Sequence, residues 1–408
     1  MTDTESSTST PVTEVPPFPE PRTCPYAPPD SMLRLAERGP LNKVRLYNGR
    51  HAWLVSGYSQ ARSLLADPRI SSDRTNPDFP ILAPRFEAGH ARKVALLGAD
   101  PPEHTTHRKL LNPEFTLKQI QAMRPRIEQI TGELIDRMVA AGPPVDLVTA
   151  LAVQVPSITV SEMIGVPVED SEFFRDVAGN LMQSSDAQTL QTSARQLLEY
   201  LTRMAVEQER EPGSGLIGVL ARGVLAGELT RDELVQIIYV LLVAGHETTS
   251  GLISLGVMTL LEHPEQLAEI KRYPALIPTA VEELLRFVAL TETGGLRVAT
   301  ADVEIDGYRI EAGDGVLMSA SLVNRDPQVH DRPHEFDIHR TSRRHLAFGH
   351  GVHQCVGQHL ARLELEVVFE LLFRRLPDLR ITVPVDQVPL RSVEFGPVQS
   401  VLELPVTW

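Results

Sequence analysis

The sequence predicts a mainly α-helical fold with a small β subdomain, and three observations support that prediction. Residues 231–262 form one long helical pattern that is apolar nearly all round in its middle, as expected of a helix that crosses a core. Helical patterns also follow one another from residue 116 to about residue 222. Short strand patterns, in contrast, gather around the turn signals Asn48-Gly49 and Asp306-Gly307.

Length and composition limit the class of protein. The chain has 408 residues, which we interpret as a flexible tail, residues 1–28, and a single catalytic domain, residues 29–408. Apolar residues make up 42% and charged residues 23%, as in soluble globular proteins. The net charge of -14 argues against nucleic acid or an anionic membrane as the main partner. Two distant cysteines make no disulfide framework, which favours a reducing cytoplasm.

No targeting or membrane segment is expected. Residues 1–19 lack the basic start and the apolar core of a signal peptide. The most apolar run, residues 237–244, is far shorter than the roughly 20 residues that span a bilayer. We therefore expect a cytoplasmic protein without membrane contact.

The remaining elements follow in chain order. A hairpin is expected over residues 43–55, and a stretch rich in loops and prolines over residues 70–97. Further strands are expected at residues 303–310 and 315–322 and towards Trp408. Besides the long helix, the predicted helices begin at Asp100-Pro101 or cover residues 31–37, 59–66, 117–140, 147–163, 169–182, 187–208, 278–290 and 356–375.

Cys355 lies in the segment FGHGVHQCVG, residues 348–357, directly before a predicted helix. Its glycines permit close approach of a flat ligand, and the start of a helix stabilises a thiolate, which is a metal ligand. The residues leave three interpretations open. The cysteine could be a buried apolar side chain, a zinc ligand together with His350, His353 and His359, or an axial ligand of haem iron. A dinucleotide-binding glycine motif is excluded, because residue 354 is not glycine.

Polar residues at helical spacing form further candidate sites. His104 and Arg108 share one helix face and could bind two carboxylates or simply face solvent. Glu247 and Thr248 interrupt the apolar middle of the long helix, where polar groups need a reason to be buried. Thr248 could merely bond the carbonyl of Ala244. A His-Glu-x-x-His metal motif is excluded, because residue 250 is Ser.

The segment 348–357 resembles the haem-binding loop of the cytochromes P450 of the soluble bacterial type. The resemblance implies the cytochrome P450 fold and haem b, with Cys355 as the axial iron ligand. It also implies that Ala244 and Gly245 leave room for dioxygen and that Glu247 and Thr248 supply protons. The other implied haem-binding residues are His104, Arg108, Arg297, Phe348, His353 and Gly357.

Glu283-Leu284-Leu285-Arg286 taken alone is typical of a surface ion pair. It also resembles the Glu-x-x-Arg structural pair of the same family. The usual third member, an arginine, is missing, because residue 335 is Glu. Arg340 is the candidate replacement.

The resemblance implies a haem-thiolate monooxygenase that inserts one oxygen atom from O2 into a C–H or C=C bond. The expected substrate is an apolar small molecule such as a polyketide, macrolide or terpenoid, in secondary metabolism or xenobiotic oxidation. The alternatives are a peroxide-dependent haem-thiolate oxidase and a haem protein that only binds a ligand; Glu247 and Thr248 argue against both. The expected substrate pocket consists of Val240, Val243, Ala289, Leu290, Thr291 and Phe395.

Electrons must come from partner proteins, because the chain has no flavin or nicotinamide motif and too few cysteines for an iron–sulfur cluster. We expect a ferredoxin and a ferredoxin reductase, with NAD(P)H as the ultimate donor, acting on a monomeric protein. Ferredoxins are usually acidic, so a local basic face is needed. The candidates for this face are Arg343, Arg344, Lys109 and Arg362.

Overall fold

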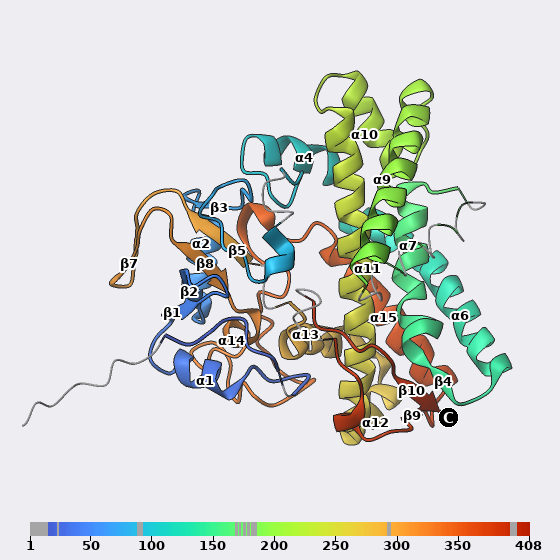
Figure 1. Cartoon of the computed structure of the whole chain (residues 1–408). Coiled ribbons are helices and arrows are strands. Elements are labelled where there is room, and N and C mark those ends of the chain that lie inside the picture. The colour runs from blue at the N-terminus through green and yellow to red at the C-terminus, as the bar shows by residue number, and fades with distance from the viewer. Residues whose placement is uncertain are drawn as a thin grey trace, which may run out of the picture.

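Helix α11 (Arg231–Glu262) runs through the middle of the molecule. It has the predicted bounds, because Thr230 and Glu233 form a reciprocal capping box at its start. In Figure 1 the helices lie mainly on one side and the sheet on the other. The computed structural model describes residues 15–22, 24–87, 93–167, 170, 173, 177, 180, 186–291, 295–391 and 398–408.

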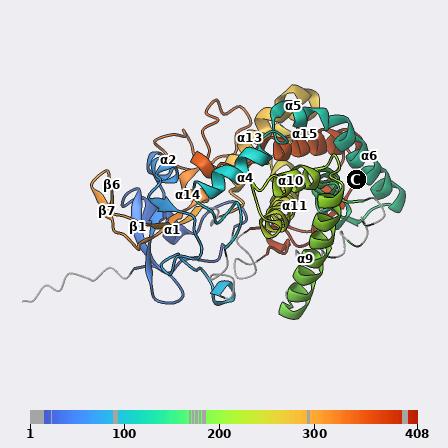
Figure 2. The same ribbon diagram turned by 90° about the horizontal axis from the view of Figure 1, so that it is seen from above.

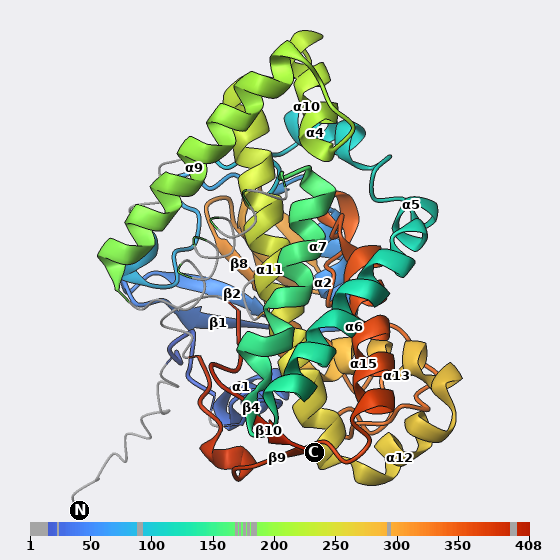
Figure 3. The same ribbon diagram turned by 90° about the vertical axis from the view of Figure 1, so that its right-hand side faces the viewer.

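Other helices surround α11 and bury its apolar side chains in one large core. Figure 3 shows α7, α9 and α15 flanking it along its length. The helices of this side are α4 (Glu103–Leu111), α5 (Leu117–Ala122), α6 (Arg124–Ala141), α7 (Gln154–Ile164), α9 (Ala187–Arg210), α10 (Leu216–Leu225), α12 (Pro264–Arg272), α13 (Ile277–Val288) and α15 (Gln358–Arg375).

The main sheet has the strand order β1-β2-β8-β5-β3. Its strands are β1 (Leu41–Arg45), β2 (His51–Val55), β3 (Ile70–Ser71), β5 (Gly295–Ala299) and β8 (Gly315–Met318). The predicted hairpin is confirmed as β1 paired with β2, and β2 then pairs in parallel with β8. Figure 2 shows this sheet beside α1 (Asp30–Ala36), α2 (Tyr58–Ala66) and α14 (Ala320–Val323). The smaller strands are β4 (Val145–Asp146), β6 (Val303–Ile305), β7 (Tyr308–Ile310), β9 (Arg380–Ile381) and β10 (Pro405–Thr407).

Two predicted helices differ from the structure. The helix predicted over residues 117–140 divides at Met123, with Pro125 in the first turn of α6, a position that proline favours. The helix predicted over residues 147–163 begins with a π-helical segment, Val148–Ala152, before α7. Most of the helix predicted over residues 169–182 lies outside the described residues.

The predicted flexible tail is too long. Pro17 pairs with Arg45, and Phe18 is buried against Val44 and other residues of the sheet side. The described residues 15–22 and 24–28 therefore belong to the folded structure.

Within the part of the chain that the structure describes, α11 alone is long and apolar enough to span a membrane. However, 61% of its apolar window is buried inside the protein. That burial is the behaviour of a core helix.

Candidate active site

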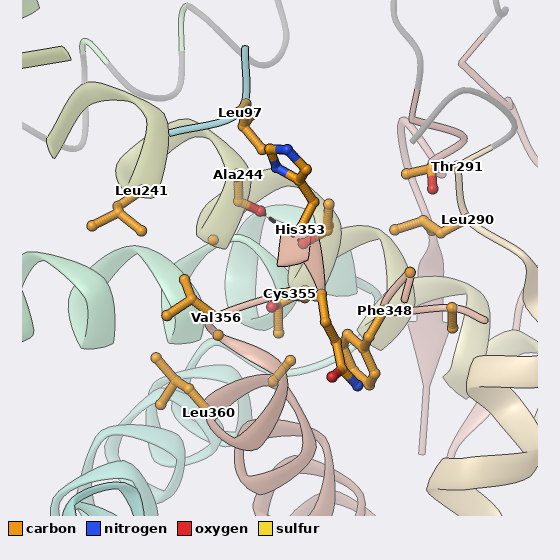
Figure 4. Close-up of a pocket in the computed structure, with 18 of the residues that line it drawn as sticks. Leu97, Leu241, Ala244, Leu290, Thr291, Phe348, His353, Cys355, Val356 and Leu360 are labelled. Carbon is orange, nitrogen blue, oxygen red and sulfur yellow. Dashed lines mark hydrogen bonds between the residues drawn. The ribbon is translucent and has the colours of Figure 1, made fainter. Parts of the chain in front are cut away.

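A cavity of ≈ 380 Å³ lies between α11 and the segment that leads into α15. Figure 4 shows the elements that meet there: Ala244 comes from α11, Leu290 and Thr291 follow α13, and Phe348 and Cys355 belong to the loop before α15. The lining is mainly apolar. The cavity therefore suits a large apolar ligand that a few polar groups orient.

The loop before α15 holds Cys355 at the cavity through its backbone. Gly349 and Gly351 have φ angles of 67° and 73°, which is the left-handed conformation that glycine adopts without strain. A Cβ atom at Gly351 would lie 2.5 Å from the Leu65 carbonyl oxygen, so no other residue fits without a shift. The Cys355 N–H donates to the Phe348 carbonyl over 2.9 Å, which closes the loop.

The sulfur of Cys355 faces the cavity and not the outside of the protein. Its side chain has accessible surface, yet burial raises the pKa of its thiol, because the surroundings are protein on every other side. The Gly357 N–H and the charges of Arg108 and Arg362 lower the pKa, but burial outweighs them. The expected stabilisation of a thiolate by the helix start is thus insufficient by itself. Gly357 has an ordinary φ of -82° and acts through its N–H.

Four nitrogen-bearing side chains gather at one end of the cavity: His104, Arg108, Arg297 and His353. The two imidazole rings lie 4.0 Å apart, centre to centre. Burial, and then Arg108, lowers the pKa of His104 to about 4, whereas burial, and then Arg297, lowers that of His353 to about 3. The structure thus brings together the four residues that the resemblance implies for binding the haem propionates.

These four residues fit an anionic ligand. Arg108 donates to the Gln354 carbonyl over 2.6 Å and Arg297 to the Leu296 carbonyl over 2.7 Å. Neither arginine forms an ion pair with another described residue, although Arg297 is only 8% exposed. A buried guanidinium requires a compensating anion. A haem would supply both an anion for the arginines, through its two carboxylates, and an iron ion for the Cys355 sulfur.

The zinc interpretation does not match the structure. Among the described residues, the ligand atoms that lie within 4.8 Å of one another belong to Glu103, His107 and Glu233, and not to the four residues around Cys355. The His107 Nδ1 accepts from the Leu96 N–H over 3.3 Å, so a neutral ring carries its proton on the nitrogen that faces Glu233. This second cluster is therefore a hydrogen-bonded pair, with Glu103 nearby.

Some residues in the middle of α11 line the cavity, whereas Glu247 contacts the C-terminal segment. Ala244, Gly245 and Thr248 line the cavity, and the Thr248 hydroxyl donates to the Ala244 carbonyl over 2.7 Å. Glu247 is not among the described lining residues. Its carboxylate pairs with Arg391 of the C-terminal segment.

The Glu283–Arg286 pair is buried and not at the surface. The two residues are 4% and 1% exposed, and the Arg286 Nη2 lies 2.7 Å from the Glu283 Oε1. Arg340 donates from its Nε to the same carboxylate, with an N–O distance of 3.1 Å. The candidate replacement for the missing arginine is confirmed.

The predicted substrate pocket is mostly at the cavity. Val240, Ala289, Leu290 and Thr291 line it. Val243 is not among the described lining residues, because one residue corresponds to about 100° of rotation on a helix, which turns Val243 away when Ala244 faces the cavity. Phe395 lies outside the described residues.

Ala289 ends α13 in the left-handed region, with φ 43° and ψ 64°. It is 2% exposed and its carbonyl accepts from Arg22 over 3.3 Å. This residue therefore combines a place in the cavity wall with a backbone conformation that residues other than glycine rarely adopt.

Sequence reasoning missed Glu364 and His246. Glu364 is 2% exposed and lines the cavity, and burial raises the pKa of its carboxyl to about 8 although Thr159 and Thr249 lower it. Burial lowers the pKa of His246 to about 4. The Glu364 Oε1 and the His246 Nε2 have no hydrogen-bond partner among the described residues. A charged residue on the apolar face of its helix was the available signal for Glu364.

Comparisons with known proteins agree with this geometry. The family model for cytochrome P450 matches residues 275–389. The chain is 49% identical to a vitamin D3 dihydroxylase of Streptomyces griseolus, over 100% of each chain. It is 50% identical to cytochrome P450 105A3 of Streptomyces carbophilus, over 97% of this chain and 96% of the relative.

A solved structure is similar over nearly the whole chain. The mycinamicin VIII C21 methyl hydroxylase of Micromonospora griseorubida, bound to mycinamicin VIII, superposes with a TM-score of 0.89. It is 38% identical, and the match covers 97% of this chain and 100% of the hydroxylase.

Proposed function

The chain belongs to the cytochrome P450 family and is a haem monooxygenase, and from this premise we propose which residues carry the reaction and what it oxidises. One observation supports the assignment of the site: the Cys355 sulfur lines the same cavity as the buried Arg297 and the half-buried Arg108, two arginines that form no ion pair with another described residue. Cys355 lies far from Arg108 and Arg297 in the sequence, so the fold itself must bring the sulfur and the two guanidinium groups to one cavity.

The proposed cofactor is haem b, which is iron protoporphyrin IX. Cys355 would ligate the iron, and His104, Arg108, Arg297 and His353 would hold the two propionates. Phe348 and Gly357 would contact the ring from the loop. When bound, haem iron with a thiolate ligand activates dioxygen and favours cleavage of its O–O bond.

The proposed roles of the α11 residues concern space and protons. Ala244 and Gly245 keep side-chain bulk out of the cavity where dioxygen must fit. Thr248 holds its hydroxyl at the cavity wall by donating to the Ala244 carbonyl over 2.7 Å. Glu247, the preceding residue, is the acid that exchanges protons with solvent and passes them towards that hydroxyl.

The proposed substrate is a large apolar molecule, such as a polyketide, macrolide or terpenoid. The cavity wall around Val240, Leu241 and Leu290 offers apolar contact, and Thr291 is a rare hydrogen-bonding group there. The relatives are named for vitamin D3 and for the macrolide mycinamicin VIII, which are both large and mainly apolar. A role in secondary metabolism or xenobiotic oxidation is proposed on the same grounds.

The decisive experiment is spectroscopic. The purified protein should be red, and its reduced carbon monoxide adduct should have the long-wavelength Soret band of thiolate ligation. Titration with steroids, terpenoids and macrolides should then identify compounds that change the spin state of the iron. A colourless protein would contradict the haem proposal, whereas a red protein that responds to none of these compounds would contradict only the substrate class.

Electron transfer from a ferredoxin is the proposed route, in a cytoplasmic monomer. Arg343 and Arg344 are both exposed and offer the positive charge that an acidic ferredoxin requires. Lys109 pairs with Glu228, and Arg362 pairs with Glu282. These two residues are therefore less free to attract a partner than Arg343 and Arg344.

A further inference from the structure

We propose that Arg391 is a positioning residue that holds Glu247 in an ionised, closed state until substrate fills the cavity. The inference rests on the proposed function, in which Glu247 supplies protons next to Thr248. It adds a second residue, from a different part of the chain, and a reason for protons to be delivered only when substrate is present.

The Glu247–Arg391 pair is largely removed from water. The side chains of the two residues are 16% and 10% exposed, and the Arg391 Nη1 contacts the Glu247 Oε1. Attraction between charges is stronger in such surroundings than in water. A guanidinium does not give up its proton in proteins, so Arg391 can hold the carboxylate but cannot supply a proton to it.

A chain of hydrogen bonds links this pair to the cavity wall. The Arg391 N–H donates to the Ser400 carbonyl over 2.8 Å, and the neighbouring residues pair as antiparallel backbone. One residue earlier, the Gln399 N–H donates to the Leu290 carbonyl over 2.9 Å. Val398 pairs with Thr291. Leu290 and Thr291 line the cavity, so the backbone that carries Arg391 is hydrogen-bonded to residues that a ligand must touch.

Arg22 strengthens this link from the other side. Its Nη1 donates to the Gln399 Oε1 over 2.5 Å and its Nη2 to the Ala289 carbonyl over 3.3 Å. A displacement of the wall at residues 289–291 must therefore change the contacts of Gln399. Ser400 and Val401, the next two residues, pair with Arg391 and Leu390, so the displacement reaches Arg391.

The proton balance is simple. In the closed pair the Glu247 carboxylate carries no proton and has none to give. When substrate displaces the wall and the pair opens, the carboxylate accepts one proton from water. It passes that proton to the Thr248 hydroxyl, which releases its own proton into the cavity. The net result is the transfer of one proton from solvent to the cavity, with no change of oxidation state in these residues.

Arg391→Gln tests the proposal in the haem-bound protein, with two measurements. The first is the infrared carbonyl band of a protonated Glu247 carboxyl, identified by its loss in the Arg391→Gln, Glu247→Gln double variant. Without substrate at neutral pH, the band should be weak in the parent protein. In Arg391→Gln its intensity should rise about tenfold or more, the effect of losing an adjacent guanidinium. Arg391→Lys keeps the charge and should resemble the parent.

The second measurement is oxygen consumption without substrate, with the electron donors present. It should rise several-fold in Arg391→Gln, because proton delivery no longer waits for substrate, and should stay at the parent level in Arg380→Gln, an exposed arginine of β9. If Arg391→Gln fails to fold, Glu247→Asp can be used instead, because the shorter side chain increases the distance between the carboxylate and the Arg391 guanidinium. It should produce the same two changes.

The outcomes separate the inference from the proposed function. If the protein lacks the thiolate carbon monoxide spectrum, or if Glu247→Gln turns over substrate as fast as the parent, the proposed function of the site fails. If Glu247→Gln slows turnover but neither the band nor substrate-free oxygen consumption changes in Arg391→Gln, this inference alone is overturned.

Discussion

The Arg340 Nε donates to both carboxylate oxygens of Glu283, at 3.2 and 3.1 Å. Glu335 contributes only its backbone carbonyl, which accepts from Arg286 and from Arg340 at 2.9 Å each. Its side chain points outward and pairs with Arg332. The third charge of the buried group thus comes from five residues further along the chain, and the negative residue at position 335 does not enter it.

Arg340→Leu should strongly destabilise the protein. It leaves the Glu283 carboxylate, 4% exposed, with one cationic partner fewer. Removing one member of a buried ion pair costs about 3–5 kcal/mol. Urea unfolding of the haem-bound protein measures this cost. Glu335→Gln is the matched control and should stay within about 0.5 kcal/mol of the parent; equal losses in the two variants would contradict the assignment.

Arg297→Met should weaken the retention of haem. The guanidinium is 8% exposed, and burial lowers its pKa to about 10, so its charge needs an anion. A hydrogen bond to a charged group contributes about 1.5–3 kcal/mol, which corresponds to a tenfold or larger increase in the rate of haem loss. Transfer of haem to an excess of an apoprotein acceptor measures this rate. Arg309→Gln, at an exposed residue of strand β7, should lose haem as slowly as the parent.

Thr248→Ala should uncouple electron consumption from product formation. The proposed proton path loses its hydroxyl at the cavity, so product formation should fall about tenfold or more while peroxide accumulates. The substrate-induced spin change should remain. Thr259 is the matched control, because its hydroxyl donates to the Leu255 carbonyl over the same 2.7 Å but lies away from the cavity. A similar loss of coupling in Thr259→Ala would point to a general effect on α11.

Glu364 should make stability fall as pH rises. Burial raises the pKa of its carboxyl to about 8, so between its ordinary value and pH 8 the folded protein holds a proton that the unfolded chain has released. From pH 6.5 to 8, the free energy of unfolding should therefore fall by about 1.4 kcal/mol per pH unit relative to Glu364→Gln. The difference should level off above pH 8.

Urea unfolding of both proteins at several pH values tests this. His246 has a pKa that burial lowers to about 4 in the folded protein, and its contribution is common to the parent and to Glu364→Gln, so it cancels in their difference. Parallel curves for the parent and Glu364→Gln would show that the carboxyl is already ionised in the folded state.

Reversal of charge at Arg343 and Arg344 to Glu should slow reduction of the haem iron by ferredoxin, most clearly at low ionic strength. Both residues are exposed, so the fold and substrate binding should be unaffected. Stopped-flow reduction measures the rate, and the substrate-induced spin change is the control. Unchanged reduction rates would remove these two residues from the partner surface.

Local signals in the sequence predicted the long helix and the cysteine loop well. The Thr230–Glu233 capping box marks the start of α11, and the glycines of the loop require the positive φ angles that they have. Contacts between distant residues were not predictable in the same way. The parallel pairing of β2 with β8 and the Glu247–Arg391 pair join residues far apart in the chain. No local periodicity records such contacts.

The left-handed backbone at Ala289 limits how this cavity can be redesigned. A branched or bulky residue at this position would change the shape of the cavity and would also cost about 1–2 kcal/mol in backbone strain. Glycine would relieve strain but would remove the methyl group from the wall. Libraries that seek new oxidation products should therefore keep Ala289 fixed and place their diversity at Val240, Leu290 and Thr291, which do not have a left-handed backbone.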